Sequence, residues 1–168
     1  WRRVRRDFLV GVLFTDAGVA VAAIDRDGCV QRAEYRPAGD DSARADAIKA
    51  AVQDHRLQRC ACVAIVPRSA YQLQQLEAPN VPTEEMATAV RWRLKDVIAV
   101  PVDQAVTDVI PVPSGPSRHA SNMIYAVAAP RAQMEAYAAM LRDARLSVRA
   151  LDIPELALRN LAAQVPDQ

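Results

Sequence analysis

Two apolar runs at the start of the chain, each followed by a turn signal, constrain the fold most strongly. Residues 8–14 are continuously apolar, which is typical of a strand buried on both faces of a sheet. The turn at 15–18 ends in Gly18, which can adopt a positive φ, and a second apolar run follows at 19–24. Asp27 and Gly28 mark another turn before a more polar, alternating segment at 29–36. These signals predict three antiparallel strands in a meander.

A helix and a fourth strand are expected next. Asp40, Asp41 and Ser42 are residue types that cap helices, and apolar residues then recur with helical period to about Leu57. Residues 60–66 form a short apolar run that Pro67 ends. The predicted opening motif is therefore three strands, a helix and a strand.

The remaining chain predicts further strands and helices. We expect a strand at 71–76, and then a helix from Thr83, its N-cap, to about Ile98. Two strands at 105–112 and 123–129 flank a Pro/Ser/Gly-rich loop. Pro130 opens another helix, and a strand near 148–153 and a short helix at 154–163 complete the pattern.

Composition excludes several classes of protein. Hydrophobic residues make up 51% of the 168 residues, so the chain can bury a core, and a net charge of +1 argues against a dedicated nucleic-acid binder. No apolar run approaches the roughly 20 residues of a membrane-spanning helix. Three cysteines are too few for a disulfide framework, which favours a reducing compartment. Because the first residue is Trp1 rather than methionine, we expect a piece of a longer protein.

Patterns of catalytic or metal-binding residues are weak. A nuclease of the ribonuclease H type needs several carboxylates on metal ions, one of them on the first strand, but no acid lies between Asp7 and Asp16. The serines and His119 of the loop at 113–122 lack a nucleophile-elbow pattern. With two histidines and only a C-x-C cysteine pair, Cys60 and Cys62, no metal cluster is indicated. We therefore expect no enzyme activity and no metal site.

Four segments resemble the MshI family, which are biogenesis proteins of the mannose-sensitive haemagglutinin type IV pilus related to PilM. These segments are YQLQQLEAP at 71–79, AVRWRLKD at 89–96, PVDQAV at 101–106 and DIPELALRN at 152–160. The resemblance implies an α/β fold: the first lobe of an actin-like (ribonuclease-H-like) fold with an FtsA/PilM-type α+β insert. It implies a partial lobe at 8–67 and 147–168 and an inserted subdomain at 68–146. Four arginines make residues 1–7 a basic arm, which is either solvated or in contact with acidic lipid headgroups or nucleic-acid phosphates.

The resemblance also implies a function. PilM-like proteins are scaffolds on the cytoplasmic face of the inner membrane that hold the tail of a bitopic partner, here a PilN/MshJ-like protein, with no nucleic acid and no membrane span of their own. The helix around Trp92 supports this expectation. Its tryptophan lies beside the apolar, core-facing side of the helix and among charged residues, which is typical of an interface anchor. The alternative is that Trp92 packs under the loop at 113–122. The resemblance implies that the tail lies in a groove between the lobe and the insert, with a wall formed by the strand at 71–76, the helix around Trp92 and the segment at 152–159. The expected partner-binding residues are Tyr71, Leu73, Glu85, Trp92, Asp96, Glu155 and Arg159.

Two other functions stay open. One is half of an actin-like nucleotide-binding or ATPase unit that lacks its second lobe, with Asp16 and Gly18 as weak phosphate-binding candidates. Leu13 stands where the actin-like pattern has an aspartate, and ATP with magnesium would need the second lobe, so we expect no cofactor here. The other is an FtsA-like filament subunit that self-associates through the insert.

Overall fold

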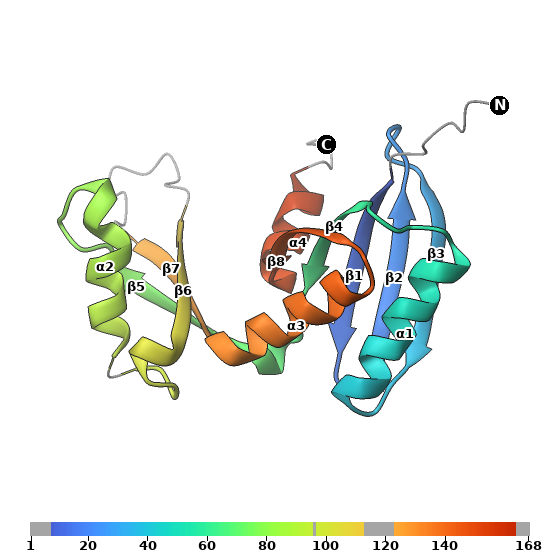
Figure 1. Ribbon diagram of the computed structural model, residues 1–168. Coiled ribbons are helices and arrows are strands. Elements are labelled where there is room, and N and C mark those ends of the chain that lie inside the picture. Colours follow the sequence, from blue (N-terminus) through green and yellow to red (C-terminus); the bar gives the residue numbers. More distant parts are fainter. Residues whose placement is uncertain (1–7, 96, 113–122, 164–168) are drawn as a thin grey trace. The chain divides into compact units, whose positions relative to one another are not determined.

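The computed structural model describes residues 8–95, 97–112 and 123–163, and it divides the chain into two compact units (Figure 1). Unit 1 runs to Arg68 and resumes at Glu135, and unit 2 is Ser69–Met134. The arm predicted at 1–7 and the loop at 113–122 lie outside the described residues.

Unit 1 is built on a five-stranded sheet with the order β3-β2-β1-β4-β8. The predicted meander is confirmed, because β1, β2 and β3 pair antiparallel, whereas β4 pairs in parallel with both β1 and β8. The strands are β1 (Leu9–Thr15), β2 (Gly18–Ile24), β3 (Val30–Pro37), β4 (Ala61–Ile65) and β8 (Ser147–Asp152).

Three helices belong wholly or mainly to unit 1: α1 (Asp41–Asp54), α3 (Arg131–Asp143) and α4 (Pro154–Ala162). Asp40 is the N-cap of α1, as predicted, and its side chain accepts a hydrogen bond from the Ala43 N–H at 2.8 Å. The helices α1 and α3 lie on the same side of the sheet (Figure 1). The rings of Phe14 in β1 and Tyr137 in α3 are 4.5 Å apart, which fixes α3 on that face.

The prediction that the first strand is buried on both faces is wrong for the described chain. Val10, Val12 and Phe14 are at most 1% exposed on the side of α1 and α3, whereas Leu9 and Leu13 on the other side are 44% and 38% exposed. Helices α1 and α3 cover one face of the sheet, and α4 has no buried residue. The other face forms an apolar hollow of about 640 Å³, the unit 1 hollow, whose lining includes Leu9, Leu13, Ala22, Ile24, Tyr35 and Ile65.

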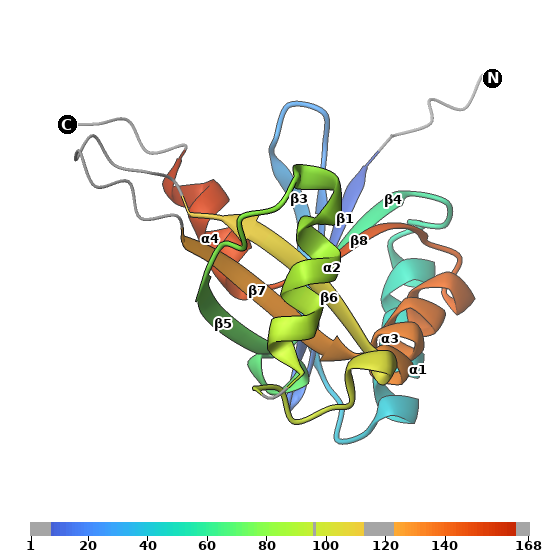
Figure 2. The same cartoon turned by 90° about the vertical axis from the view of Figure 1, so that its left-hand side faces the viewer.

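Unit 2 is a three-stranded antiparallel sheet of order β5-β7-β6 with one helix on it. In Figure 2 this helix, α2, crosses in front of the strands. Its buried Val90 and Leu94 pack on Ile124, Ala126 and Ala128 of the sheet. The elements are β5 (Gln72–Glu77), α2 (Thr83–Leu94), β6 (Ala105–Pro111) and β7 (Met123–Pro130), with 3₁₀ turns at Arg68–Ala70 and Val102–Gln104.

Two predicted boundaries differ from the structure. The insert was expected to end at 146, but unit 2 ends at Met134, because α3 packs on the sheet of unit 1 through the Phe14–Tyr137 contact. The helix α2 has Pro82 rather than Thr83 in its N-cap position, and it ends at Leu94 rather than Ile98. Tighter backbone bonds close its C-terminus, including one from the Val97 N–H to the Leu94 carbonyl at 3.0 Å.

The two faces of β1 predict a stability difference between neighbouring substitutions. Phe14→Ala removes a buried ring and should lower the free energy of unfolding by about 3 to 5 kcal/mol. Leu13→Ala truncates a side chain that is already partly exposed and should cost about 1 kcal/mol. Urea denaturation followed by circular dichroism measures both. Equal costs would show that the second face of the sheet is covered as well.

Candidate partner-binding surfaces

The pairing register of β5 separates its two leucines. Leu76 pairs with Ile124 and packs in the core under α2. Leu73 pairs with Val127, three residues further along β7. Because side chains alternate between the faces of a strand, Leu73 and Val127 lie on the sheet face opposite α2. Leu73 and Leu76 therefore lie on opposite faces of the sheet.

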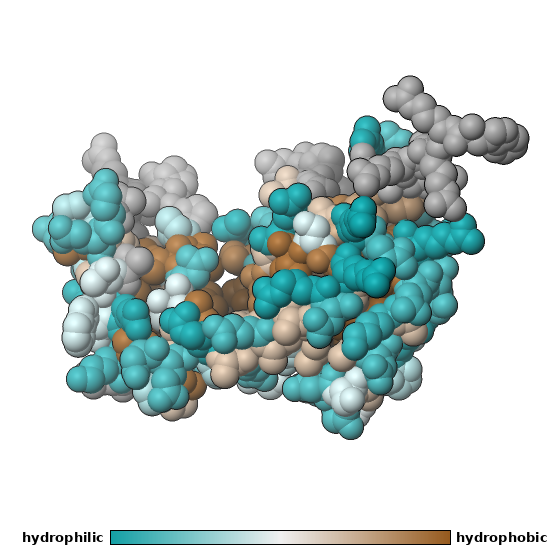
Figure 3. Space-filling view, in the orientation of Figure 1, coloured by the Kyte–Doolittle hydropathy of each residue, from teal (hydrophilic) through white to brown (hydrophobic). Residues whose placement is uncertain are grey.

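The face opposite α2, called the unit 2 sheet face here, is apolar and partly open. Val106 and Tyr125 are 39% and 36% exposed on it. In Figure 3, hydrophobic surface in brown reaches the outside over the strands of unit 2, whereas α2 presents mostly teal and white surface. By register the face includes Leu73, Val106, Ile110, Met123, Tyr125 and Val127, with the polar residues Gln75, Glu77 and Asp108 among them.

Trp92 lies on the outer side of α2. Its side chain is 68% exposed, whereas Val90 and Leu94 on the inner side are fully buried. Glu85 is also exposed, two turns before Trp92 on the same helix. At 68% exposure the indole is not packed beneath any described element, and the loop at 113–122 that the alternative invokes lies outside the described residues. Asp96, the last predicted residue of this group, lies outside the described residues.

Trp92 and Leu73 do not share a surface. The three-stranded sheet and α2 lie between them, because Leu73 is on the unit 2 sheet face and Trp92 is on the far side of the helix. Tyr71 is only 4% exposed and precedes β5, where it lines a pocket of about 220 Å³ with Gln72 and Ile98. The predicted grouping of Tyr71, Leu73 and Trp92 on one wall is therefore wrong.

The remaining predicted partner residues lie in α4 of unit 1. The Glu155 carboxylate is 3.4 Å from the Arg68 Nε, and Arg159 donates a hydrogen bond to the Asn160 side chain at 3.4 Å. Leu158 and Leu161 of this helix are more than 60% exposed. That Glu155 and Arg159 line a common groove with residues of unit 2 stays a prediction.

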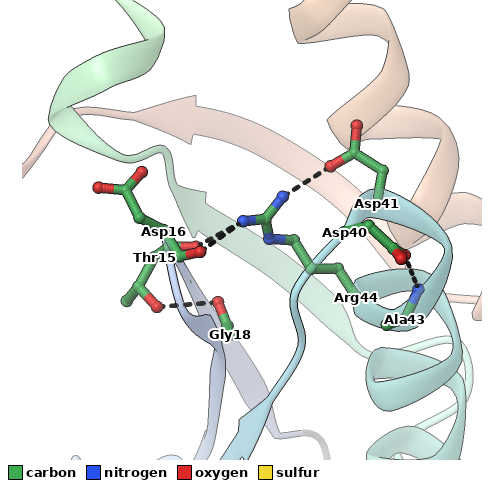
Figure 4. Close-up of polar contacts among 7 residues, drawn as sticks. All are labelled: Thr15, Asp16, Gly18, Asp40, Asp41, Ala43 and Arg44. Atoms are coloured by element: carbon green, nitrogen blue, oxygen red, sulfur yellow. Dashed lines mark hydrogen bonds and ion pairs between the residues drawn. The ribbon is translucent and has the colours of Figure 1, made fainter.

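The β1–β2 turn, where Asp16 and Gly18 were candidate phosphate ligands, is closed by protein groups (Figure 4). The Arg44 guanidinium from α1 donates to the carbonyl oxygens of Thr15 and Asp16 at 3.2 and 3.0 Å, and it pairs with Asp41 at 2.8 Å. The Thr15 hydroxyl donates to the Gly18 carbonyl at 3.0 Å. The turn thus presents carbonyl oxygens to a cation, a polarity opposite to that of a phosphate loop.

Gly18 is needed for space rather than for a positive φ. Among the described glycines only Gly28 has a positive φ. A Cβ added at Gly18 would lie 2.3 Å from the Arg36 carbonyl oxygen and 2.8 Å from the Tyr35 hydroxyl. The interpretation of Gly18 as a left-handed turn residue is therefore wrong, because β3 approaches β2 too closely at this point for any side chain.

Neither a metal site nor a membrane span is found in the described part of the chain. No group of three or more His, Cys, Asp or Glu side chains could hold a metal ion there. No helix within residues 8–95, 97–112 and 123–163 is long and apolar enough to cross a membrane. Cys62 is a fully buried core residue, as expected, and burial raises the pKa of its thiol from 9.0 to about 12 because the thiolate would lose its solvation.

The raised pKa of Cys62 predicts selective alkylation. In the native protein between pH 7 and 9, iodoacetamide should modify the exposed Cys29 and leave Cys62 unmodified, since the reactive thiolate is scarce and buried. The same burial favours the folded state below the ordinary thiol pKa and loses that advantage as pH rises toward 12. Mass spectrometry of each cysteine peptide, with a urea-unfolded control, measures the difference. Equal labelling of the two cysteines in the folded protein would contradict this placement.

Solved structures share this fold. Over 95% of the chain, the "PilM-PilN type IV pilus biogenesis complex" is similar with a TM-score of 0.78 and 22% identity. The cytoplasmic domain of EpsL, an inner membrane component of the type II secretion system of Vibrio cholerae, matches over 86% with a TM-score of 0.66 and 15% identity. A Bacteroides thetaiotaomicron protein with an actin-like ATPase fold and unknown function matches over 95% with a TM-score of 0.54 and 8% identity. No protein-family model matches the sequence, and no curated protein does.

The chain has part of an actin-like fold. The predicted fold class is thereby confirmed, including the α/β lobe and the inserted α+β unit. The chain spans only 51% to 58% of the length of these three structures. The narrower resemblance to the MshI family stays a prediction, because the similar structures are PilM, EpsL and a protein of unknown function.

Proposed function

We propose that the chain is a non-catalytic scaffold of a type IV pilus or related secretion assembly platform, and that it holds the cytoplasmic tail of a bitopic inner-membrane protein of the PilN/MshJ type. The observation that carries this proposal is the similarity to PilM in its complex with PilN, which extends over 95% of the chain and so includes the inserted unit. In this role the chain works at the cytoplasmic face of the inner membrane and is peripheral to it.

The unit 2 sheet face is the proposed location of the tail. It combines partly exposed apolar side chains such as Val106 and Tyr125 with the carboxylates of Glu77 and Asp108. Such a face can bury the apolar side chains of an extended segment and attract a basic one. Trp92, on the far side of α2, is then a separate anchor for another contact of the same platform.

The absence of catalysis is part of the proposal. The β1–β2 turn directs two carbonyl oxygens at Arg44, so this guanidinium is already bonded to protein acceptors. Leu13 is a partly exposed apolar residue of β1 and supplies no carboxylate for a metal-bound nucleotide.

The alternative is half of a nucleotide-binding unit, which the similarity to an actin-like ATPase fold favours. Isothermal titration of the chain with Mg·ATP separates the two functions. The scaffold proposal predicts no saturable heat at millimolar nucleotide and no change in melting temperature. Saturable binding that Asp16→Ala or Arg44→Ala abolishes would favour the nucleotide-binding function instead.

Two matched substitutions test where the tail binds. The probe is a fluorescent synthetic peptide with the sequence of the cytoplasmic tail of the PilN-like protein of the source organism, and anisotropy gives its Kd. Tyr125→Ala, on the unit 2 sheet face, should weaken binding at least tenfold, because partly buried aromatic anchors dominate such interfaces. Trp92→Ala should change Kd less than twofold. The reverse pattern, with both variants folded by circular dichroism, would move the tail to the outer side of α2.

A further inference from the structure

The sheet of unit 2 has two edges, β5 and β6, because β7 is its central strand. An edge strand leaves every second residue with its backbone N–H and C=O directed away from the sheet, where another strand can pair with them. Which of the two edges can accept a strand depends on how those outward groups are already used.

One backbone bond fixes which groups point outward. The Val112 N–H donates to the Met123 carbonyl at 3.2 Å, so Val112 directs its backbone groups toward β7. In an antiparallel ladder, successive residues of a strand direct their N–H and C=O alternately toward the neighbouring strand and away from it. The β5–β7 and β6–β7 pairings contain no bulge, so this alternation continues without a break along β5 and along β6. The outward residues are therefore Ala105, Thr107, Val109 and Pro111 on β6, and Leu73, Gln75 and Glu77 on β5.

The β6 edge is almost completely blocked. Pro111 has no N–H to offer, and the Val109 N–H donates to the carboxylate of Asp108 at 2.8 Å. The Ala105 N–H donates to the Val102 carbonyl, and its carbonyl accepts from Arg131 at 3.2 Å. Thr107 alone keeps both outward groups available among the described residues.

The β5 edge is open over its middle. Within the described chain, the outward N–H and C=O of Leu73 and Gln75 have no hydrogen-bond partner, and the strand contains neither proline nor a bulge. At its end, the Glu77 carbonyl accepts a hydrogen bond from the Arg93 guanidinium at 2.8 Å, which marks where an added strand would stop. The side chains of Gln75 and Glu77 are exposed.

We propose that a partner segment binds unit 2 as an added β-strand along β5, paired with Leu73 and Gln75. This inference rests on the proposed function, since the segment is the partner's cytoplasmic tail. Apolar side chains on one face of the added strand extend the unit 2 sheet face beside Leu73. A lysine or arginine on the same face meets the exposed Glu77 carboxylate, so the fitting tail alternates apolar residues and carries a basic one.

A proline substitution tests the backbone bond itself. Gln75→Pro removes one outward N–H and leaves the ladder bonds of Gln74 and Leu76 to β7 in place, since proline is tolerated on an edge strand. With the same fluorescent tail peptide, Gln75→Pro should raise Kd at least tenfold, whereas Gln75→Ala should change it less than twofold. The matched control is Thr107→Pro, which removes the equivalent outward N–H from β6 and should bind like wild type.

The outcomes separate the strand addition from the scaffold function. Equal Kd for wild type and Gln75→Pro would overturn strand addition while leaving tail binding intact. No binding to wild type would overturn both. If Gln75→Pro unfolds, a second test uses the wild-type chain and a series of tail peptides. Each peptide carries one N-methyl group on a different backbone nitrogen, and its Kd is measured. Strand addition predicts loss of binding at alternate positions only, and a uniform or irregular pattern would contradict it.

Discussion

The parallel pairing of β4 with β8 is the contact on which the rest of the structure depends. It joins segments on either side of the inserted unit, from Ala61–Ser147 to Ile65–Asp152. Backbone bonds continue it beyond both ends, from the Arg59 N–H to the Arg145 carbonyl at 2.7 Å and from the Val66 N–H to the Asp152 carbonyl at 3.0 Å. Because this pairing adds β8 directly to the sheet of unit 1, the chain between β4 and β8 can form unit 2 without interrupting the core of unit 1.

The inserted unit is asymmetric, and its proposed function follows from that asymmetry. One helix covers one face of its small sheet, and the apolar residues of β7 are divided between the two faces. Ile124, Ala126 and Ala128 pack under α2, whereas Tyr125 and Val127 lie on the uncovered face. One face of this sheet is covered by α2, the other is apolar and partly exposed, and the β5 edge has free backbone groups within the described chain. Such a sheet is suited to bind an extended segment.

The sequence predicts the elements of the fold much better than it predicts the surfaces. Apolar runs and turn residues locate the strands within about two residues, because strand periodicity and capping are local properties. They do not reveal which face of β1 is covered, since Leu13 and Phe14 are equally apolar in the sequence and differ only in what packs on them. The family resemblance places Leu73 and Trp92 on one binding surface, and the β5–β7 register shows that they lie on different ones. Gly18 similarly required knowledge of the β3 backbone beside it.

The most direct test of the account is to map the bound tail on the protein. Amide chemical shifts of the ¹⁵N-labelled chain would be followed during titration with the tail peptide of the PilN-like protein. Tail binding along β5 predicts saturable shifts in β5 and across the unit 2 sheet face, including Leu73, Gln75 and Tyr125, with slower hydrogen exchange at the amides of Leu73 and Gln75. Shifts confined to the β1–β2 turn, the unit 1 hollow or the outer side of α2, or no shifts at all, would contradict it.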